Sequence, residues 1–366
     1  MLPLFAWGKL ITYYSVRIQT MKNISKFQKQ LLAWYQVAKR DLPWRQTRDP
    51  YKILVSEIML QQTQVDTVIP YYERWIKHFP DFYKLAAAKE TEVLKLWQGL
   101  GYYRRAKMLH RNAQEICAQH AGQLPKDTPS LLSLPGIGRY TAGAVASIAF
   151  GVKTPLLDGN VIRILTRIFL ISKNVADKKT IEQLWGISKN ILPDKNVGDF
   201  NQALMELGAT ICFPRNPNCA QCPVSKLCAA HQTGKEEFFP VKAPAQKITK
   251  LNHYAFLLRD KNNRLLVKKQ KAGERWADLW TLPHFEKLEE GLKNFKIKNE
   301  NLKKIRTDKH GFTRYQITLN TYVATHTLKS VAKESNYVWM TKSQVKHSTF
   351  PAVYQKIITE TSQNDI

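Results

Sequence analysis

The sequence predicts a mainly α-helical protein of 366 residues with a smaller α+β domain at its C-terminal end. Two patterns support this fold class. Apolar residues recur at helical spacing through residues 27–231, whereas short β-rich runs separated by polar turns follow residue 250. The stretch between them, HQTGKEEFFPVKAPAQKITK, has two prolines, four lysines and little apolar periodicity. We therefore predict a helical domain over 27–231, a linker over 232–249 and an α+β domain over 250–360.

The individual elements follow from the same patterns. Helices are predicted for FQKQLLAWYQVAK, YKILVSEIMLQQTQVDTV, TEVLKLWQGL, HRNAQEICAQH, PSLLSL and TAGAVASIAFG, and strands for HYAFLLRD, RLLVKKQ, YQITLNTYVATH and NYVWM. Residues 1–26 are expected to form a poorly ordered extension. We prefer this to a transit peptide because serine is scarce and Met21 offers a second start, although the first 40 residues contain no aspartate or glutamate.

The composition restricts the class of binding partner. Lysine and arginine outnumber aspartate and glutamate by 56 to 29, which gives a formal net charge of +27. This excess favours a polyanionic partner, with nucleic acid ahead of an anionic membrane. No stretch of the sequence reaches the roughly 18 apolar residues that a membrane-spanning helix needs, so we predict no membrane anchor.

Four of the five cysteines lie close together near the end of the helical region. Cys212, Cys219, Cys222 and Cys228 have the spacing C-x6-C-x2-C-x5-C. A disulfide framework is typical of small secreted chains, and a zinc site usually repeats the short C-x2-C pair, which occurs once here. Four thiolates on a short loop also hold a 4Fe–4S cluster, which we favour over zinc and disulfides. Cys117 is expected to be a buried or unreactive thiol.

The run LPGIGRYTAGA lies between two predicted helices and predicts a helix-hairpin-helix at about residues 128–150. Gly136 and Gly138 allow a tight turn and let backbone amides approach a phosphate. The helix that follows directs its N-terminal dipole at the same anion. An ordinary helical hairpin without a ligand is the alternative, and the positive net charge favours the phosphate contact.

Two carboxylates are candidates for chemistry. Glu57 lies on a predicted helix rich in apolar residues, an environment in which a carboxyl group keeps its proton at neutral pH. The alternative is a surface residue on a polar stripe with Gln61 and Gln64. Asp158, in PLLDGNVIRIL, follows the hairpin and could equally be a turn residue or a helix N-cap. Only their combination with the hairpin and the cysteines favours a function.

This combination resembles the helix-hairpin-helix DNA glycosylase superfamily, in which an aspartate follows the hairpin and the cluster loop has the same cysteine spacing. In its endonuclease III branch a lysine that attacks the sugar occupies the position of Tyr140, so the tyrosine argues against that chemistry. The runs PWRQTRDPYKILVSEIMLQQTQV, GLGYYRRA, LPGIGRYTAGA and LDGNV instead resemble the adenine DNA glycosylases of the MutY family. The resemblance covers roughly residues 27–230 and implies a two-lobed helical domain with a 4Fe–4S cluster at the cysteine loop, residues 212–228.

The resemblance implies that adenine mispaired with 8-oxoguanine or guanine is flipped out of double-stranded DNA and excised, leaving an abasic site. Glu57 would protonate adenine N7, and Asp158 would stabilise the oxocarbenium-like sugar or bond to it transiently. Tyr140 and Asn160 would hold Asp158 and the sugar in place, and Arg45 and Gln202 would contact the base. The residues implied to contact the duplex are Leu60, Gln62, Tyr102, Gly136 and Gly138. Gln62 and Tyr102 match residues that form a wedge beside the lesion. Without the resemblance, the alternative for Tyr102 is a residue of the hydrophobic core, and that for Gln62 is a surface amide.

The second domain resembles, more loosely, the lesion-recognition domain of the same family, whose fold is related to Nudix hydrolases. AGERWADLWTLPHFE, residues 272–286, carries this likeness. The sequence lacks a glutamate-rich metal box, so we expect recognition of a lesion rather than hydrolysis. Where relatives usually have Phe-Ser-His on the loop that contacts 8-oxoguanine, this chain has Phe312, Thr313 and Arg314. The alternative for Phe312 is a residue of the strand core.

Three functions remain after this comparison, and we favour the first. An adenine glycosylase without lyase activity releases free adenine and makes no prompt strand break. A pyrimidine glycosylase and lyase of the endonuclease III type forms a covalent adduct that borohydride traps. A non-catalytic DNA-binding scaffold binds the lesion without forming a product. For the favoured function the resemblance implies a cytoplasmic, bacterial-type monomer that acts on the chromosome.

Overall fold

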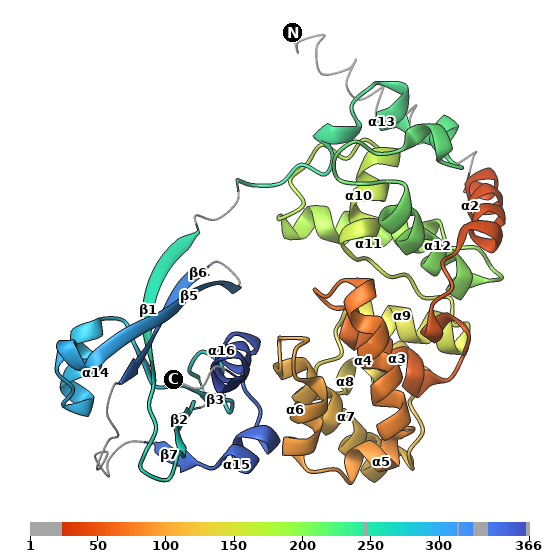
Figure 1. Ribbon diagram of the computed structural model, residues 1–366. Coiled ribbons are helices and arrows are strands. Elements are labelled where there is room, and N and C mark those ends of the chain that lie inside the picture. The colour runs from red at the N-terminus through yellow and green to blue at the C-terminus, as the bar shows by residue number, and fades with distance from the viewer. Residues whose placement is uncertain (1–23, 245–247, 272, 313–314, 325–335, 364–366) are drawn as a thin grey trace. The chain divides into compact units, whose positions relative to one another are not determined.

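The computed structural model describes residues 24–244, 248–271, 273–312, 315–324 and 336–363 (Figure 1). Two compact units emerge from it. The first unit comprises Met1–Ala87 and Met108–Ala245, and the second comprises Ala88–Lys107 and Gln246–Ile366. Most of the predicted N-terminal extension, residues 1–23, lies outside the described residues, and the first described helix begins at Ile24.

The first unit is helical, as the sequence predicts. Its elements, including α7, which continues from the second unit, are α2 (Ile24–Ala38), η1 (Pro43–Arg45), α3 (Pro50–Leu60), α4 (Val65–His78), α5 (Phe82–Ala86), α7 (Arg104–His120), α8 (Thr128–Ser133), α9 (Arg139–Phe150), α10 (Gly159–Ile168), α11 (Lys178–Asn190), α12 (Val197–Thr210), η2 (Cys219–Gln221), η3 (Ser225–Leu227), α13 (Ala229–Gln232) and η4 (Glu236–Phe238). The predicted helix-hairpin-helix is confirmed as α8, a turn at residues 134–138, and α9.

Caps and close packing fix the helices that surround the candidate site. Asp49 accepts a hydrogen bond from the Tyr51 amide at the start of α3, at 2.9 Å, and Pro50 occupies the first turn. The side chain of Gln61 reaches from the end of α3 to the Thr141 hydroxyl on α9, at 3.3 Å. A Cβ atom on Gly143 would lie 2.1 Å from the carbonyl oxygen of Pro155, so only glycine lets α9 approach that segment.

One predicted helix is wrong. The sequence predicted a continuous helix over residues 51–68, but α3 ends at Leu60 and α4 begins at Val65. Gln62 between them has a left-handed backbone, with φ of 58°. The polar run from residue 61 to 64 has no apolar face to bury, so tertiary packing does not hold it in a helix.

The second unit contains α6 (Glu90–Trp97) and an α+β domain. Its described strands form a four-stranded sheet in the order β4-β1-β6-β5 and a three-stranded sheet in the order β3-β2-β7. The elements are β1 (Thr249–Leu257), β2 (Leu265–Lys269), β3 (Trp280–Thr281), β4 (His284–Phe285), α14 (Leu288–Phe295), η5 (Asn299–Asn301), β5 (Leu302–Phe312), β6 (Tyr315–Ala324), β7 (Tyr337–Met340), α15 (Lys342–His347) and α16 (Ala352–Gln363). Strands β1 and β6 are parallel and the other pairs antiparallel.

Each face of the larger sheet has its own core. Ala255, Leu257 and Leu319 pack with Tyr354 and Ile357 of α16 on one face. On the other face Phe256 packs against Phe295 of α14, and Figure 1 shows these two helices on opposite sides of the sheet. The four strands that the sequence predicted are confirmed as β1, β2, β6 and β7, whereas β3, β4 and β5 were not predicted. Among the described residues, no helix is long and apolar enough to cross a membrane.

Candidate active site

Glu57 is buried in the first unit, on the face of α3 that packs against α9. Its exposure is 5 %, so the alternative of a surface stripe with Gln61 and Gln64 is wrong. Burial raises the pKa of Glu57 to about 7; a hydrogen bond from Tyr140 lowers this pKa and the charge of Asp158 raises it. A large share of Glu57 is therefore protonated at neutral pH, as a general acid requires.

Tyr140 is the partner of Glu57. It lies in the first turn of α9, directly after the hairpin, and its hydroxyl donates to Glu57 Oε2 at 2.6 Å. The Tyr140 hydroxyl oxygen is also 3.4 Å from Met205 Sδ. Burial, together with the nearby carboxylates, raises the pKa of Tyr140 well above its usual value. The phenol therefore stays neutral and serves as a hydrogen-bond donor to Glu57.

Asp158 is the N-cap of α10. Its Oδ1 accepts from the Val161 amide at 2.7 Å and its Oδ2 accepts from Asn160 Nδ2 at 2.9 Å. Burial raises the pKa of Asp158, and these two hydrogen bonds lower it. The N-cap interpretation is thus correct, and the carboxylate is also close enough to Glu57 to raise its pKa. The sequence pattern could not show that Asp158 both caps α10 and lies close to Glu57.

Asn160 is itself held in place by neighbours that the sequence analysis missed. Arg163 Nη2 donates to Asn160 Oδ1 and to the Gly208 carbonyl, both at 2.9 Å, and its Nε donates to the Cys212 carbonyl at 2.7 Å. A Cβ atom on Gly208 would lie 2.5 Å from Asn160 Cβ. The absence of a side chain at position 208 therefore makes room for Asn160.

A second buried carboxylate, Glu206, was also missed. Arg40 donates to both of its oxygens, at 2.8 and 2.9 Å, and Arg45 Nη2 donates to Oε2 at 2.7 Å. Burial alone would raise the pKa of Glu206, but the two guanidinium groups hold it at about 2. Arg45 is thereby oriented, and its charge lowers the pKa of Glu57. Gln202, on the same helix as Glu206, is 8 % exposed.

The hairpin presents both of its glycines to solvent. Gly136 has φ of 74°, and a Cβ atom there would lie 2.7 Å from Met108 Cβ, so the turn requires glycine at this position. Gly138 is the N-cap of α9, with open space where a side chain would be. Both glycines are thus exposed at the start of α9, and the phosphate contact predicted from the sequence there stays a prediction.

Two of the residues predicted to contact the duplex have strained backbones. Gln62 is exposed, with φ of 58°. Tyr102 has φ of 46° and is 44 % exposed, so the alternative of a core residue is wrong. Leu60 is half-buried at the end of α3. Residues other than glycine rarely adopt this conformation, and such residues cluster at functional sites.

The four clustered cysteines are all half-buried free thiols. The pKa of Cys219 is raised to about 11 and that of Cys222 to about 12, chiefly by burial and in smaller part by the charges of Cys212 and Cys228. Cys219 and Cys222 are therefore each close enough to Cys212 and Cys228 for those charges to affect their pKa. Arg167 Nη1 also donates to Cys212 Sγ at 3.2 Å, a contact that suits a thiolate. A soft four-sulfur donor set fits an iron–sulfur cluster.

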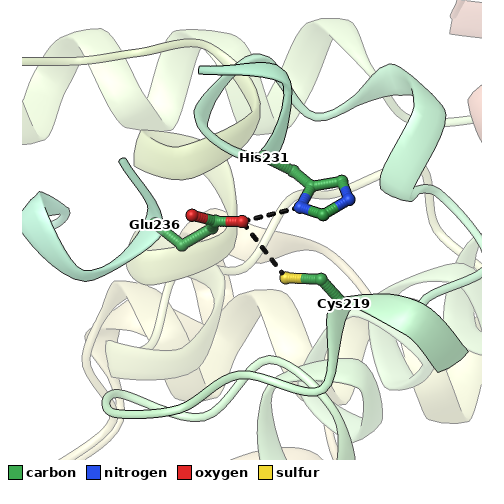
Figure 2. Close-up of side chains that lie close together, drawn as sticks. All are labelled: Cys219, His231 and Glu236. Atoms are coloured by element: carbon green, nitrogen blue, oxygen red, sulfur yellow. Dashed lines mark hydrogen bonds and ion pairs between the residues drawn. The ribbon is translucent and has the colours of Figure 1, made fainter. Parts of the chain in front are cut away.

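A mixed group of ligand atoms shares one of these cysteines. Figure 2 shows Glu236 between His231 and Cys219: its Oε1 is 2.6 Å from His231 Nδ1 and accepts from Cys219 Sγ at 3.6 Å. One ligand atom from each residue lies within 4.8 Å of the other two. Sulfur, nitrogen and oxygen donors at this spacing could hold a metal ion such as zinc. The sequence analysis missed His231 and Glu236.

The loop predicted to contact the lesion is described only in part. Phe312 ends β5, and its pairing partner in β6 is Tyr315. Thr313 and Arg314 lie outside the described residues.

Comparisons with known proteins agree with this architecture. The HhH-GPD superfamily of base excision DNA repair proteins matches residues 55–190, and the NUDIX domain matches residues 254–360. The adenine DNA glycosylase of Buchnera aphidicola subsp. Acyrthosiphon pisum is 36% identical over 344 residues, which covers 92% of this chain and 98% of the relative. The human adenine DNA glycosylase is 46% identical over 224 residues, or 59% of this chain and 41% of the human protein.

Solved structures resemble the helical part. A thermostable thymine-DNA glycosylase is 32% identical with a TM-score of 0.53, covering 58% of this chain and 98% of its own. An endonuclease III in a non-covalent complex with DNA, 22% identical with a TM-score of 0.50, covers 58% of this chain and 97% of its own and shows a likeness of fold. Because the Buchnera relative is matched over 98% of its length, this chain belongs to the adenine DNA glycosylases, base-excision repair enzymes that cleave N-glycosyl bonds in DNA.

Proposed function

We propose that this adenine DNA glycosylase excises adenine paired with 8-oxoguanine or guanine and leaves an abasic site without cutting the strand. The observation that carries the proposal is the hydrogen bond from Tyr140 to the buried Glu57, at 2.6 Å. Tyr140 carries a phenol and no amine, so its side chain cannot attack the sugar as a lysine would. The site therefore supports proton transfer to the base rather than covalent lyase chemistry.

In the proposed reaction Glu57 donates its proton to adenine N7. The bond between the sugar and the base then breaks, and its electron pair leaves with the adenine. The carboxylate of Asp158 stabilises the positive charge that develops on the sugar. Water then adds to the sugar and gives its proton to the Glu57 carboxylate, which yields the abasic site and restores the acid. Glu57 suits the role of the acid because burial raises its pKa to about 7, so that about half of it is protonated near pH 7.

Neighbouring residues would orient the reacting groups. Asn160 bonds Asp158 Oδ2 and is fixed by Arg163, while Tyr140 orients Glu57. Arg45 and Gln202 would contact the flipped base, and the Glu206 carboxylate holds Arg45 in position for this. Each of these side chains is at least partly buried, which limits the access of water to the reaction.

Other residues would bind the duplex. The exposed Gly136 and Gly138 would let the amides of α9 contact a phosphate, and Leu60, Gln62 and Tyr102 would contact or separate the bases beside the flipped adenine. Phe312 and Thr313 would contact the 8-oxoguanine. Because the sequence has no glutamate-rich metal box, we assign the Nudix-like domain to recognition.

For the cofactor we propose a 4Fe–4S cluster held by Cys212, Cys219, Cys222 and Cys228. When bound, the cluster would link the loop that follows α12 through four sulfur ligands. The hydrogen bond from Arg167 to Cys212 supports this choice, since it favours a thiolate. Zinc held by Cys219, His231 and Glu236 is the competing occupant. Iron and sulfide analysis of a His231→Ala variant separates them, because only the zinc site loses a ligand.

The test of the proposed function is single-turnover cleavage of duplexes with adenine opposite 8-oxoguanine or guanine. A duplex with thymine glycol and an undamaged duplex serve as controls, and each is read before and after hot alkali. We expect breaks only after alkali and only from the adenine mispairs. Prompt breaks with a borohydride-trapped adduct would indicate a lyase instead, and well-folded protein that releases no adenine would indicate a binding scaffold.

A further inference from the structure

The loop between α6 and α7 contains one residue, Tyr102, in a backbone conformation that its side chain does not favour. Gly99, Gly101 and Tyr102 all have positive φ, of 110°, 72° and 46°. Glycine adopts such values readily, but a tyrosine does so only where surrounding contacts impose them. Contacts with surrounding residues must therefore hold Tyr102 in this conformation.

Some of these contacts are local. Trp97 Nε1 donates to the Gly101 carbonyl at 3.0 Å, and Arg105 Nη2 donates to the carbonyls of Leu100 and Gly101, both at 3.2 Å. The Arg105 guanidinium lies 5.5 Å from the centre of the Tyr102 ring. These bonds define the path of the loop, but they all come from the same short segment.

Other contacts come from residues about 250 positions away in the sequence, within the same compact unit. The Tyr103 hydroxyl donates to the Phe350 carbonyl at 3.2 Å. Gln98 Nε2 donates to the same carbonyl at 3.3 Å and to Gln355 Oε1 at 2.5 Å. Lys95 Nζ donates to the Ser348 carbonyl at 3.0 Å. Residues on both sides of the loop thus bond to one turn between α15 and α16.

That turn is itself firmly held. The Phe350 side chain is 2 % exposed and packs in the core of the Nudix-like domain with Val353 and Tyr354. The carbonyl of Thr349 accepts from the Trp280 amide at 3.0 Å. The Phe350 carbonyl is therefore an acceptor with a fixed position, and a group that donates a hydrogen bond to it is held in place.

We propose that Tyr103 and Gln98 are positioning residues through which the Nudix-like domain holds Tyr102 in its left-handed, exposed conformation. The inference rests on the proposed function, because it takes Tyr102 as the residue that separates the bases. It gives the Nudix-like domain a second role: besides contacting the lesion, its turn before α16 supports the loop that helps to flip adenine.

Tyr103→Phe tests this by removing one hydroxyl while keeping the ring. We expect the single-turnover rate on adenine opposite 8-oxoguanine to fall roughly three- to tenfold, the scale of one hydrogen bond. We also expect the fluorescence of 2-aminopurine placed at the adenine position to rise more slowly, because extrusion of the base from the duplex is slowed. Tyr83→Phe is the matched control, since Tyr83 also donates its hydroxyl to a backbone carbonyl, that of Ala121, at 2.7 Å, and lies outside this loop.

A double-mutant cycle shows whether Tyr103 acts through Tyr102. In a Tyr102→Ala background, Tyr103→Phe should have no further effect on rate or extrusion. An undiminished effect there, or an effect equal to that of Tyr83→Phe, would overturn the inference. The wild-type rate is measured first: its absence would overturn the proposed function, whereas a normal wild-type rate with an additive cycle would overturn only this inference.

Discussion

Glu57 and Glu206 are both buried glutamates of the first unit, yet their surroundings shift their pKa values in opposite directions. Their exposed fractions are 5 % and 0 %. Glu57 receives one hydrogen bond from a neutral phenol, and burial raises its pKa to about 7. Glu206 is also buried, but bonds from Arg40 and Arg45 hold its pKa at about 2. Burial sets the cost of a charge, and the partner decides whether the charge is kept.

The largest expected effect comes from removing the proton donor. Glu57→Gln keeps the size of the side chain but cannot transfer a proton, so the single-turnover rate should fall by about 10²- to 10⁴-fold. Asp158→Asn should cause a loss of similar size because the developing positive charge loses its counter-charge. Both variants should still bind the mispaired duplex. A rate within tenfold of wild type for either would contradict the assignment.

Removing the paired carboxylate should instead reduce stability. Glu206→Gln leaves the Arg45 guanidinium, whose side chain is 11% exposed, without its counter-charge. We expect the free energy of unfolding in urea to fall by about 3–5 kcal/mol. Glu182→Gln is the matched control, since it breaks the surface pair with Arg139 and should cost less than about 1 kcal/mol. Equal losses in the two variants would show that burial does not distinguish these pairs.

The two glutamates should also give opposite dependences of stability on pH. The folded-state pKa of Glu57 is raised to about 7, so the stability that it contributes is present below pH 4.5 and is lost as pH rises through 7. Glu57→Gln should therefore be more stable than wild type above pH 7, by up to about 3 kcal/mol. The folded-state pKa of Glu206 is lowered to about 2, so its contribution is present above pH 4.5 and is lost as pH falls toward 2.

Urea unfolding between pH 5 and 8 checks this prediction for Glu57, and acid unfolding below pH 5 checks it for Glu206. The rate of adenine release should also fall as pH rises past about 7, because the acid form of Glu57 is depleted. A rate that is flat to pH 9 would exclude Glu57 as the proton donor.

The smallest effect is expected from Tyr140→Phe. The hydrogen bond from Tyr140 lowers the pKa of Glu57, so its loss should raise that pKa further and move the alkaline limb of the pH–rate profile to higher pH. At neutral pH the rate should change by roughly fivefold or less, the scale of one hydrogen bond. Tyr83→Phe should leave the profile unchanged, and an unmoved limb in Tyr140→Phe would contradict the role given to this bond.

The sequence was sufficient to predict Glu57 but not Glu206. The apolar neighbours of Glu57 on its helix favoured burial, and the structure then excluded the surface position that the sequence left open. Glu206 is recognisable only from its partners, and Arg45 lies 161 positions away. Likewise, nothing in the sequence near Tyr103 indicates that its hydroxyl bonds to Phe350, 247 positions further on. Local patterns predict burial, whereas pairings over such distances require the fold.

Two errors in the secondary structure have a related cause. Apolar periodicity continues across the break at Gln62, so the pattern alone suggested one helix where the chain turns. Strand β5 was not predicted because its sequence, LKKIRTDKHGF, has more charged than apolar residues. It is a strand because β6 pairs with it along its length, from Leu302 with Ala324 to Phe312 with Tyr315. At residues 61–64 tertiary packing is missing and the helix ends, whereas at β5 tertiary contacts outweigh local propensity.

The capping of α10 by Asp158 bears on how variants of this enzyme should be classified. Asparagine caps a helix about as well as aspartate, so Asp158→Asn should leave the melting temperature almost unchanged, whereas Asp158→Ala should cost about 1 kcal/mol. A screen based on expression level or thermal stability would therefore score the inactive asparagine variant as harmless. Variants at this position need an assay of adenine release, because a variant that loses activity can keep the stability of the folded protein.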